Sequence, residues 1–388
     1  MQRTIKAENF MADAEPIKIA ATGLPLPDQV ALVLQGGGAL GSYQLGVYEA
    51  LEKARIDIDW VAGISIGAVN AAIIAGNPPG RRLERLHAFW KKVSGGLPAL
   101  PFWPGDFGRE ALHEMSAATV AMFGIPGFFR PRLLPPFFAP AGRPGALSFY
   151  DSTPLIETLD ALIDWELLNN GPTRLSIGAV EVESGNFRFF DNRSDRIDAR
   201  HVMASGALPP GLPPVEIDGK LWWDGGIVSN TPLAHVVDNQ DADMLVFQVD
   251  LFPASHDLPR TMMDVIAREK EIRFSSRTRQ ISDQLIRTRR QHQAVARLLD
   301  KLPAAMADDP EVVALRAMTR EYSVNVVQLI YRANAWEGGS RDYEFSTRTM
   351  HDHIEAGKLA VAETMTQSAL IARNIYDGET AAFDLNPR

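Results

Sequence analysis

Gly63-Ile64-Ser65-Ile66-Gly67 is the stretch that decides the fold of this chain. Residues 56–62 before it predict a short strand, and residues 68–75 after it have the small apolar side chains of a buried helix. A serine on a sharp strand-to-helix turn is typical of a nucleophile elbow, which exposes the serine hydroxyl. Gly63 and Gly67 let the strand and the helix pack closely, and the helix amino terminus adds partial positive charge beside Ser65. The segment therefore predicts a catalytic serine.

A glycine cluster lies upstream, between a predicted buried strand at residues 30–34 and a predicted helix at residues 42–51. It reads Gly36-Gly37-Gly38-Ala39-Leu40-Gly41. Such a turn directs several N–H groups toward one anion. One interpretation is an oxyanion hole for acyl transfer, and the nearby serine elbow favours it.

The same cluster has a rival interpretation as a dinucleotide fingerprint. Gly36, Gly38 and Gly41 satisfy the G-x-G-x-x-G pattern. Asp57 and Asp59 follow roughly twenty residues later, where a ribose-binding acid would stand. A nucleotide-binding Rossmann-like module therefore remains an alternative at this point.

A third motif, Asp224-Gly225-Gly226, follows a predicted hairpin at residues 215–223 that has a D-G turn. An aspartate at a strand end beside two glycines can approach another backbone closely. In isolation the same residues would simply predict a turn.

Together and in this order, the three motifs resemble those of the patatin-like phospholipase family over about residues 28–250. The resemblance implies a three-layer α/β/α sandwich with a central, mostly parallel sheet. It implies a Ser–Asp dyad in which Ser65 is the nucleophile and Asp224 the base. It also implies that the oxyanion hole is formed by Gly36, Gly37 and Gly38. The glycines that support the elbow and the loops would be Gly41, Gly63, Gly67, Gly225 and Gly226. Leu40 stands where the family usually has Arg or Lys, so a cation that could meet a phosphate is missing there.

The resemblance further implies a serine hydrolase of lipid acyl esters that needs no cofactor. A dyad needs no histidine, although His235 and His256 follow Asp224 and leave a Ser–Asp–His order open. The pair His351 and His353 does not share a helix face, and no metal site is expected. A non-catalytic lipid-binding protein is the second alternative.

Composition limits the partners and the compartment. The chain has 388 residues, 46% of them hydrophobic, so it can bury a large core. The net charge of −9 argues against a nucleic-acid partner. There is no cysteine and no apolar run of signal-peptide or membrane-spanning length, which predicts a cytoplasmic protein. Transient contact with a membrane surface is an open alternative, and the oligomeric state is not predicted.

Three segments are expected: an N-terminal arm at 1–27, a catalytic domain at 28–250 and a mainly helical extension at 251–388. The insert at 97–146 is rich in proline and aromatic residues. Its prolines argue against long helices, and its aromatic side chains suggest a lid or a wall over an acyl pocket. In the extension, residues 260–301 predict a basic amphipathic helix that packs by its apolar side. Residues 324–331 predict an edge strand.

Overall fold

A computed structural model describes residues 18–95, 106–253, 258–319, 322–332, 337 and 340–385. Most of the predicted N-terminal arm, the beginning of the proline-rich insert and His256 lie outside the described residues.

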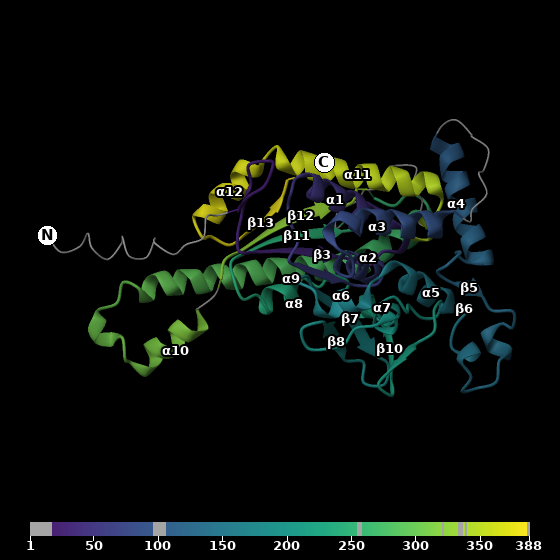
Figure 1. Ribbon diagram of the computed structural model, residues 1–388, viewed down its shortest axis with the longest axis horizontal. Coiled ribbons are helices and arrows are strands. Elements are labelled where there is room, and N and C mark those ends of the chain that lie inside the picture. Colours follow the sequence, from purple (N-terminus) through teal and green to yellow (C-terminus); the bar gives the residue numbers. More distant parts are fainter. Residues whose placement is uncertain are drawn as a thin grey trace.

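The fold is organised around one large, mostly parallel sheet (Figure 1). Within the described residues, nine strands form it, in the order β13-β12-β11-β3-β4-β7-β10-β9, with β8 also paired to β7. The strands are β3 (Gln29–Leu34), β4 (Trp60–Gly63), β7 (Arg174–Glu181), β8 (Phe187–Asp191), β9 (Val215–Ile217), β10 (Lys220–Asp224), β11 (Met244–Asp250), β12 (Val324–Ile330) and β13 (Ala381–Asp384). All pairs from β13 to β7 along this order are parallel, whereas β8, β9 and β10 pair antiparallel.

Helices cover both faces of the sheet, because the buried strands present apolar side chains to both sides. Leu32, Leu34 and Val61 belong to a core shared with helices α1 (Gly41–Lys53), α2 (Ile66–Ala75) and α3 (Pro79–Ser94). Ala31, Val33 and Trp60 point to the opposite face, where they pack with α8 (Leu233–Asp238) and α9 (Met262–Leu299). This arrangement confirms the expected three-layer α/β/α architecture.

The described residues form seven further α-helices. They are α4 (Asp106–Phe123), α5 (Thr153–Leu162), α6 (Trp165–Asn170), α7 (Ala199–Ser205), α10 (Pro310–Met318), α11 (Thr347–Met365) and α12 (Ser368–Tyr376). Among the helices of the described residues, none combines the length and the apolar character needed to cross a bilayer.

The C-terminal extension is built into the same sheet. Its strand β12 pairs with β11 on one side and with β13 on the other, so the strand predicted at residues 324–331 is an internal strand. The prediction of an edge strand was wrong because β13 covers its free side. Helix α11 packs along α1, and the two backbones touch at Gly46 and Gly357. A Cβ on Gly46 would lie 2.0 Å from the carbonyl oxygen of Ile354.

The insert contains one long helix, which corrects the expectation from its prolines. Helix α4 has 18 residues, and no proline occurs between Asp106 and Phe123. Proline prevents a helix only where it occurs, and the prolines of this insert lie on either side of α4. Beyond α4, strand β5 (Arg130–Pro131) of the insert pairs with β6 (Tyr150–Asp151), which follows the insert, and short turns of helix η2 (Pro136–Phe138) and η3 (Pro144–Ala146) lie between them.

Candidate active site

Ser65 lies on a strained turn between β4 and α2, as its motif predicted. Its φ and ψ are 54° and −123°, a backbone conformation that a non-glycine residue adopts only when its surroundings impose it. The flanking glycines explain how the turn closes. A Cβ on Gly63 would lie 2.3 Å from the carbonyl oxygen of Gly67, and one on Gly67 would lie 2.3 Å from that of Leu34.

Ser205 holds this elbow from outside the motif. Its hydroxyl accepts a hydrogen bond from the Ser65 N–H at 2.9 Å and donates one to the Gly178 carbonyl at 2.7 Å. The sequence analysis did not predict this role for Ser205. No pattern in the sequence indicates which serine carries such a bond, since Ser205 is 140 residues away from Ser65.

The glycine cluster passes directly over Ser65. A Cβ on Gly36 would lie 2.9 Å from the Ser65 Cβ and 2.5 Å from the side-chain oxygen of Asn230. The Gly36 N–H donates to the Asn230 carbonyl at 3.4 Å, and the Asn230 amide donates to the Gly36 carbonyl at 3.0 Å. Gly36 is thus tied to the loop after Asp224. In the part of the chain that the structure describes, no acceptor pairs with the N–H of Gly37 or Gly38.

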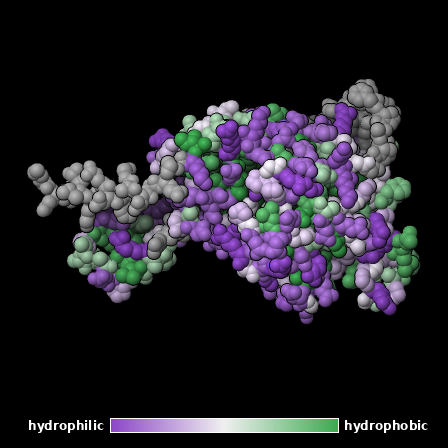
Figure 2. Space-filling model, viewed as in Figure 1, coloured by the Kyte–Doolittle hydropathy of each residue, from purple (hydrophilic) through white to green (hydrophobic). Residues whose placement is uncertain are grey.

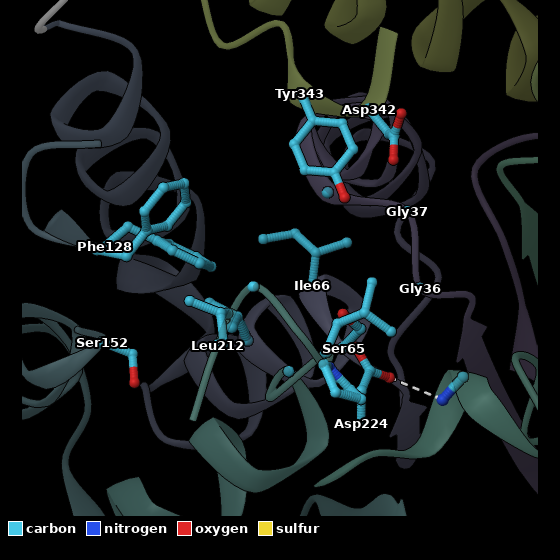
Figure 3. Close-up of a pocket in the computed structure, with 18 of the residues that line it drawn as sticks. Gly36, Gly37, Ser65, Ile66, Phe128, Ser152, Leu212, Asp224, Asp342 and Tyr343 are labelled. Carbon is cyan, nitrogen blue, oxygen red and sulfur yellow. Dashed lines mark hydrogen bonds between the residues drawn. The ribbon is translucent and has the colours of Figure 1, made fainter. Parts of the chain in front are cut away.

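Asp224 ends β10 and is brought against Ser65 (Figure 3). Because β10 runs antiparallel to β7, its carboxyl end comes back toward the turn that follows β4. The Gly226 N–H donates to the Asp224 carboxylate at 2.7 Å, and the Ser65 side chain lies beside this carboxylate (Figure 3). Gly225 supports this turn, since a Cβ there would lie 2.6 Å from the Gly178 carbonyl oxygen.

Burial sets the protonation of Asp224. Only 3% of the residue is exposed. This burial raises the pKa of its carboxyl to about 7, although the hydrogen bond from Gly226 and the neighbouring Ser65 hydroxyl act to lower it. A carboxylate with a near-neutral pKa can both take and return a proton at ordinary pH.

Ser65, Asp224 and the glycine loop line one cavity of about 180 Å³. Most of its wall is apolar and comes from five parts of the chain: α2, the insert, α5, residues 202–212 and the extension. The apolar lining side chains are Ile66, Val69, Phe128, Phe129, Leu155, Val202, Met203, Leu208, Leu212, Phe252, Phe274 and Phe345. Phe128 and Phe129 place the insert in the pocket wall, as its aromatic residues suggested.

The extension closes the cavity above the glycine loop with the short helix η6 (Arg341–Tyr343) (Figure 3). A Cβ on Gly38, whose φ is 55°, would lie 2.2 Å from the Asp342 carbonyl oxygen. Asp342 forms an ion pair with Lys270 of α9, and the Lys270 Nζ lies 4.8 Å from the centre of the Tyr343 ring. All three side chains line the pocket.

Lys270 gives the pocket a cation that the glycine loop lacks. Leu40 occupies the position of the usual basic residue, but it is completely buried and does not line the pocket. A charge introduced at Leu40 would therefore enter the core, where an unpaired cation is strongly unfavourable. The cation of this pocket comes from α9, 230 residues further along the chain, which the motifs could not indicate.

The acid required by the dinucleotide alternative is at the wrong place. Asp59 precedes β4 and accepts a hydrogen bond from the Val30 N–H at 2.8 Å, at the beginning of β3. The glycine loop follows the carboxyl end of β3, whereas Asp59 lies at the amino ends of the parallel strands β3 and β4. In a dinucleotide site the acid and the glycines both lie at the carboxyl ends of the strands.

His235 is also remote from the pocket. It stacks on Phe189 with ring centres 3.9 Å apart and contacts the Ser176 hydroxyl at 3.3 Å. His235 is not among the residues that line the cavity. In the described ranges, no cluster of three or more His, Asp or Glu side chains could hold a metal ion.

Two family models match the sequence. The model of the patatin-like phospholipase family matches residues 32–237. A second model, DUF3734, described as patatin phospholipase, matches residues 272–375.

Curated relatives and solved structures are similar to the chain at low identity. It is 27% identical over 246 residues to lysophospholipase NTE1 of Phaeosphaeria nodorum and 28% identical over 246 residues to lysophospholipase nte1 of Aspergillus terreus. Each match covers 61% of this chain and 13% of the relative's own length. VipD from Legionella pneumophila is 14% identical with a TM-score of 0.39, over 98% of this chain and 78% of that one. The type III effector ExoU is 16% identical with a TM-score of 0.31, over 91% and 58%.

Proposed function

Because the chain belongs to the patatin-like phospholipase family, we propose that it is a serine hydrolase of lipid acyl esters that works through a Ser65–Asp224 dyad. The observation that carries the proposal is that the Ser65 side chain lies against the buried Asp224 carboxyl in an apolar pocket (Figure 3). A strained serine, a base with a near-neutral pKa and free backbone donors meet at this one point.

The reaction proceeds through an acyl-enzyme. The Ser65 Oγ attacks the ester carbonyl while its proton passes to the Asp224 carboxylate. When the tetrahedral intermediate collapses, Asp224 returns this proton to the departing alkoxide, which leaves as an alcohol. Water then attacks the acyl-enzyme, Asp224 takes a proton from the water, and that proton passes back to the Ser65 Oγ as the carboxylic acid is released.

The N–H groups of Gly37 and Gly38 are the proposed oxyanion donors. Gly36 N–H already donates to Asn230, so we assign Gly36 to positioning the loop instead of binding the oxyanion. Each donor that meets the developing charge contributes about 10²–10³ in rate in enzymes of this chemistry. The amino terminus of α2 adds partial positive charge at the same point.

The pocket lining favours an acyl chain as the bound group. Aromatic and aliphatic side chains form most of the wall, and such surface gains free energy when an alkyl chain displaces water from it. The only pocket cation among the described residues, Lys270, pairs with Asp342 and suits a phosphate or carboxylate on the substrate.

A fluorophosphonate probe tests the central claim. The probe mimics the tetrahedral intermediate and is expected to label the protein at Ser65 alone, as located by mass spectrometry of the digested protein. A panel of acyl esters with different chain lengths then identifies the substrate class. The absence of any labelling would favour the alternative of a non-catalytic lipid-binding protein, and labelling at another serine would overturn the assignment of the nucleophile.

The Lys270 ion pair predicts a preference for anionic substrates. We expect Lys270→Met combined with Asp342→Asn to lower the rate on an anionic phospholipid, relative to a neutral ester, by about ten- to a hundredfold, the effect of one charge-assisted contact. The double change removes both charges, so no buried carboxylate is left unpaired. The measurement is the ratio of kcat/KM for a phospholipid and a glyceride with the same acyl chain. Lys270→Arg is the matched control and should keep the ratio within a small factor, whereas an unchanged ratio in the double variant would show that the pair is only structural.

A further inference from the structure

The insert carries a group of large apolar side chains that the protein leaves in solvent. We call it the insert patch; it consists of Phe123, Leu133, Leu134, Phe137, Phe138 and Leu147. Leu133 is fully exposed, and Phe137 and Phe138 keep 83% and 76% of their surface in solvent. Single exposed apolar residues are ordinary, but a group of this size is typical of an interaction site.

The insert patch is held in place by its own framework. Strands β5 and β6 pair at its base, Phe137 packs edge-on against Phe149 at 5.9 Å, and the Arg132 guanidinium donates to the Ser148 hydroxyl at 3.1 Å. The segment projects from one end of the molecule beside β5 and β6 (Figure 1), and Figure 2 shows apolar residues gathered at that end. The patch is therefore a defined surface of the fold.

The patch adjoins the candidate active site. The rings of Phe129 and Tyr150 pack at a tilt at the base of the insert with their centres 4.8 Å apart, and both residues line the pocket. The Phe149 N–H donates to the Pro210 carbonyl and the Tyr150 N–H to the Gly211 carbonyl, and residues 210 and 211 also line the pocket. A surface in contact with the patch would thus lie next to the cavity that holds Ser65.

The charged residues within the segment that carries most of the patch have one sign. Between Met115 and Tyr150 the sequence has three arginines and no acidic residue, although the whole chain has a net charge of −9. Arg130 pairs with Asp151, whereas Arg132 bonds to a neutral hydroxyl and Arg143 is exposed. In the described part of the chain, no carboxylate pairs with Arg132 or Arg143. These two cations can meet an anionic partner.

We propose that the insert patch docks the enzyme on an anionic lipid surface, with its phenylalanine and leucine side chains in the acyl boundary and Arg132 and Arg143 at the phosphates. Aromatic and aliphatic side chains flanked by arginine are the combination that binds this interface. The absence of acids distinguishes the patch from a surface for a basic protein partner. Docking would bring lipid esters to the pocket without a long path through water. The role of the insert patch in delivering substrate rests on the proposed function, but binding of the patch to a lipid surface requires no catalysis.

The test measures vesicle binding with catalysis removed. Full-length Ser65→Ala protein is sedimented with vesicles of phosphatidylcholine, with or without phosphatidylglycerol. We expect Phe137→Ser with Phe138→Ser to lower partitioning on both kinds of vesicle by at least about tenfold, since two exposed rings no longer enter the boundary. Arg132→Gln with Arg143→Gln should lower partitioning by more than about tenfold, and only on anionic vesicles. Each arginine near an anionic surface contributes roughly fivefold to the partition coefficient.

A matched control lies at the other end of the molecule, where α10 also exposes apolar side chains (Figure 1). Leu315→Ser with Met318→Ser should leave vesicle binding unchanged. The Phe137 and Phe138 changes, made in the active enzyme, should leave hydrolysis of a short soluble ester unchanged, because neither residue lines the pocket. Equal loss in the control, or no loss in the phenylalanine variant, overturns the proposal. A wild-type dimer that the phenylalanine changes dissociate also overturns it, because the patch would then be an interface between two copies of the chain.

Discussion

Ser65→Ala is expected to abolish ester hydrolysis and to leave the fold intact. The change removes one hydroxyl, and the Ser65 backbone N–H that donates to Ser205 remains. Loss of a nucleophile typically lowers kcat by at least about 10⁴, and what remains comes from binding and the oxyanion site. The measurement is kcat on a soluble ester, together with a thermal unfolding curve that should stay close to that of the wild type.

Ser152 provides the matched control for this experiment. It lines the same pocket but lies at the start of α5, away from Asp224 (Figure 3). Ser152→Ala should keep kcat within a small factor of the wild type. Full activity in Ser65→Ala would contradict the proposed mechanism, whatever the activity of Ser152→Ala.

Asp224→Asn should lower kcat/KM by about 10²–10⁴, the range usually ascribed to general base catalysis. The amide keeps an oxygen for the Gly226 N–H but cannot accept the Ser65 proton. The pH profile gives a second readout. Because Asp224 must be ionised to act as a base and its pKa is raised to about 7, wild-type kcat/KM should be low in acid and rise with pH through about 7. This rise should be missing from the residual activity of Asp224→Asn.

His235→Gln distinguishes the dyad from a triad. His235 contacts Ser176 and Phe189 but does not line the pocket, so the change should cost far less activity than Asp224→Asn. A loss as deep as that of Asp224→Asn would favour a triad. His256 should be replaced in parallel, because it also follows Asp224 in the chain.

Local patterns were enough to predict the core of the site. The family and the α/β/α architecture followed from three motifs, and both are confirmed. This worked because the motifs describe short stretches of backbone. The glycines beside Ser65 allow a close approach that a Cβ would block, and the D-G turn before Asp224 has a positive φ at Asp218 and Gly219. The apolar pattern likewise predicted the strand at 30–34.

The prediction that the insert has no long helix was wrong, because it counted prolines over the whole insert. The insert as a whole is rich in proline, but α4 occupies a stretch without any. The strand at 324–331 was correctly predicted, yet its place in the sheet was not, because β13 is formed by residues about 50 positions later.

By itself, the sequence determined the elbow at Ser65, the glycine loop, the turn at Asp224 and thereby the family. Only the tertiary structure decided that Ser205 and Asn230 hold these turns, that burial raises the pKa of Asp224, and that Lys270 and Asp342 close the pocket. The physical reason is the range of the interactions. A turn is specified by neighbouring residues, whereas burial and ion pairing depend on segments far apart in the sequence that meet only when the chain has folded.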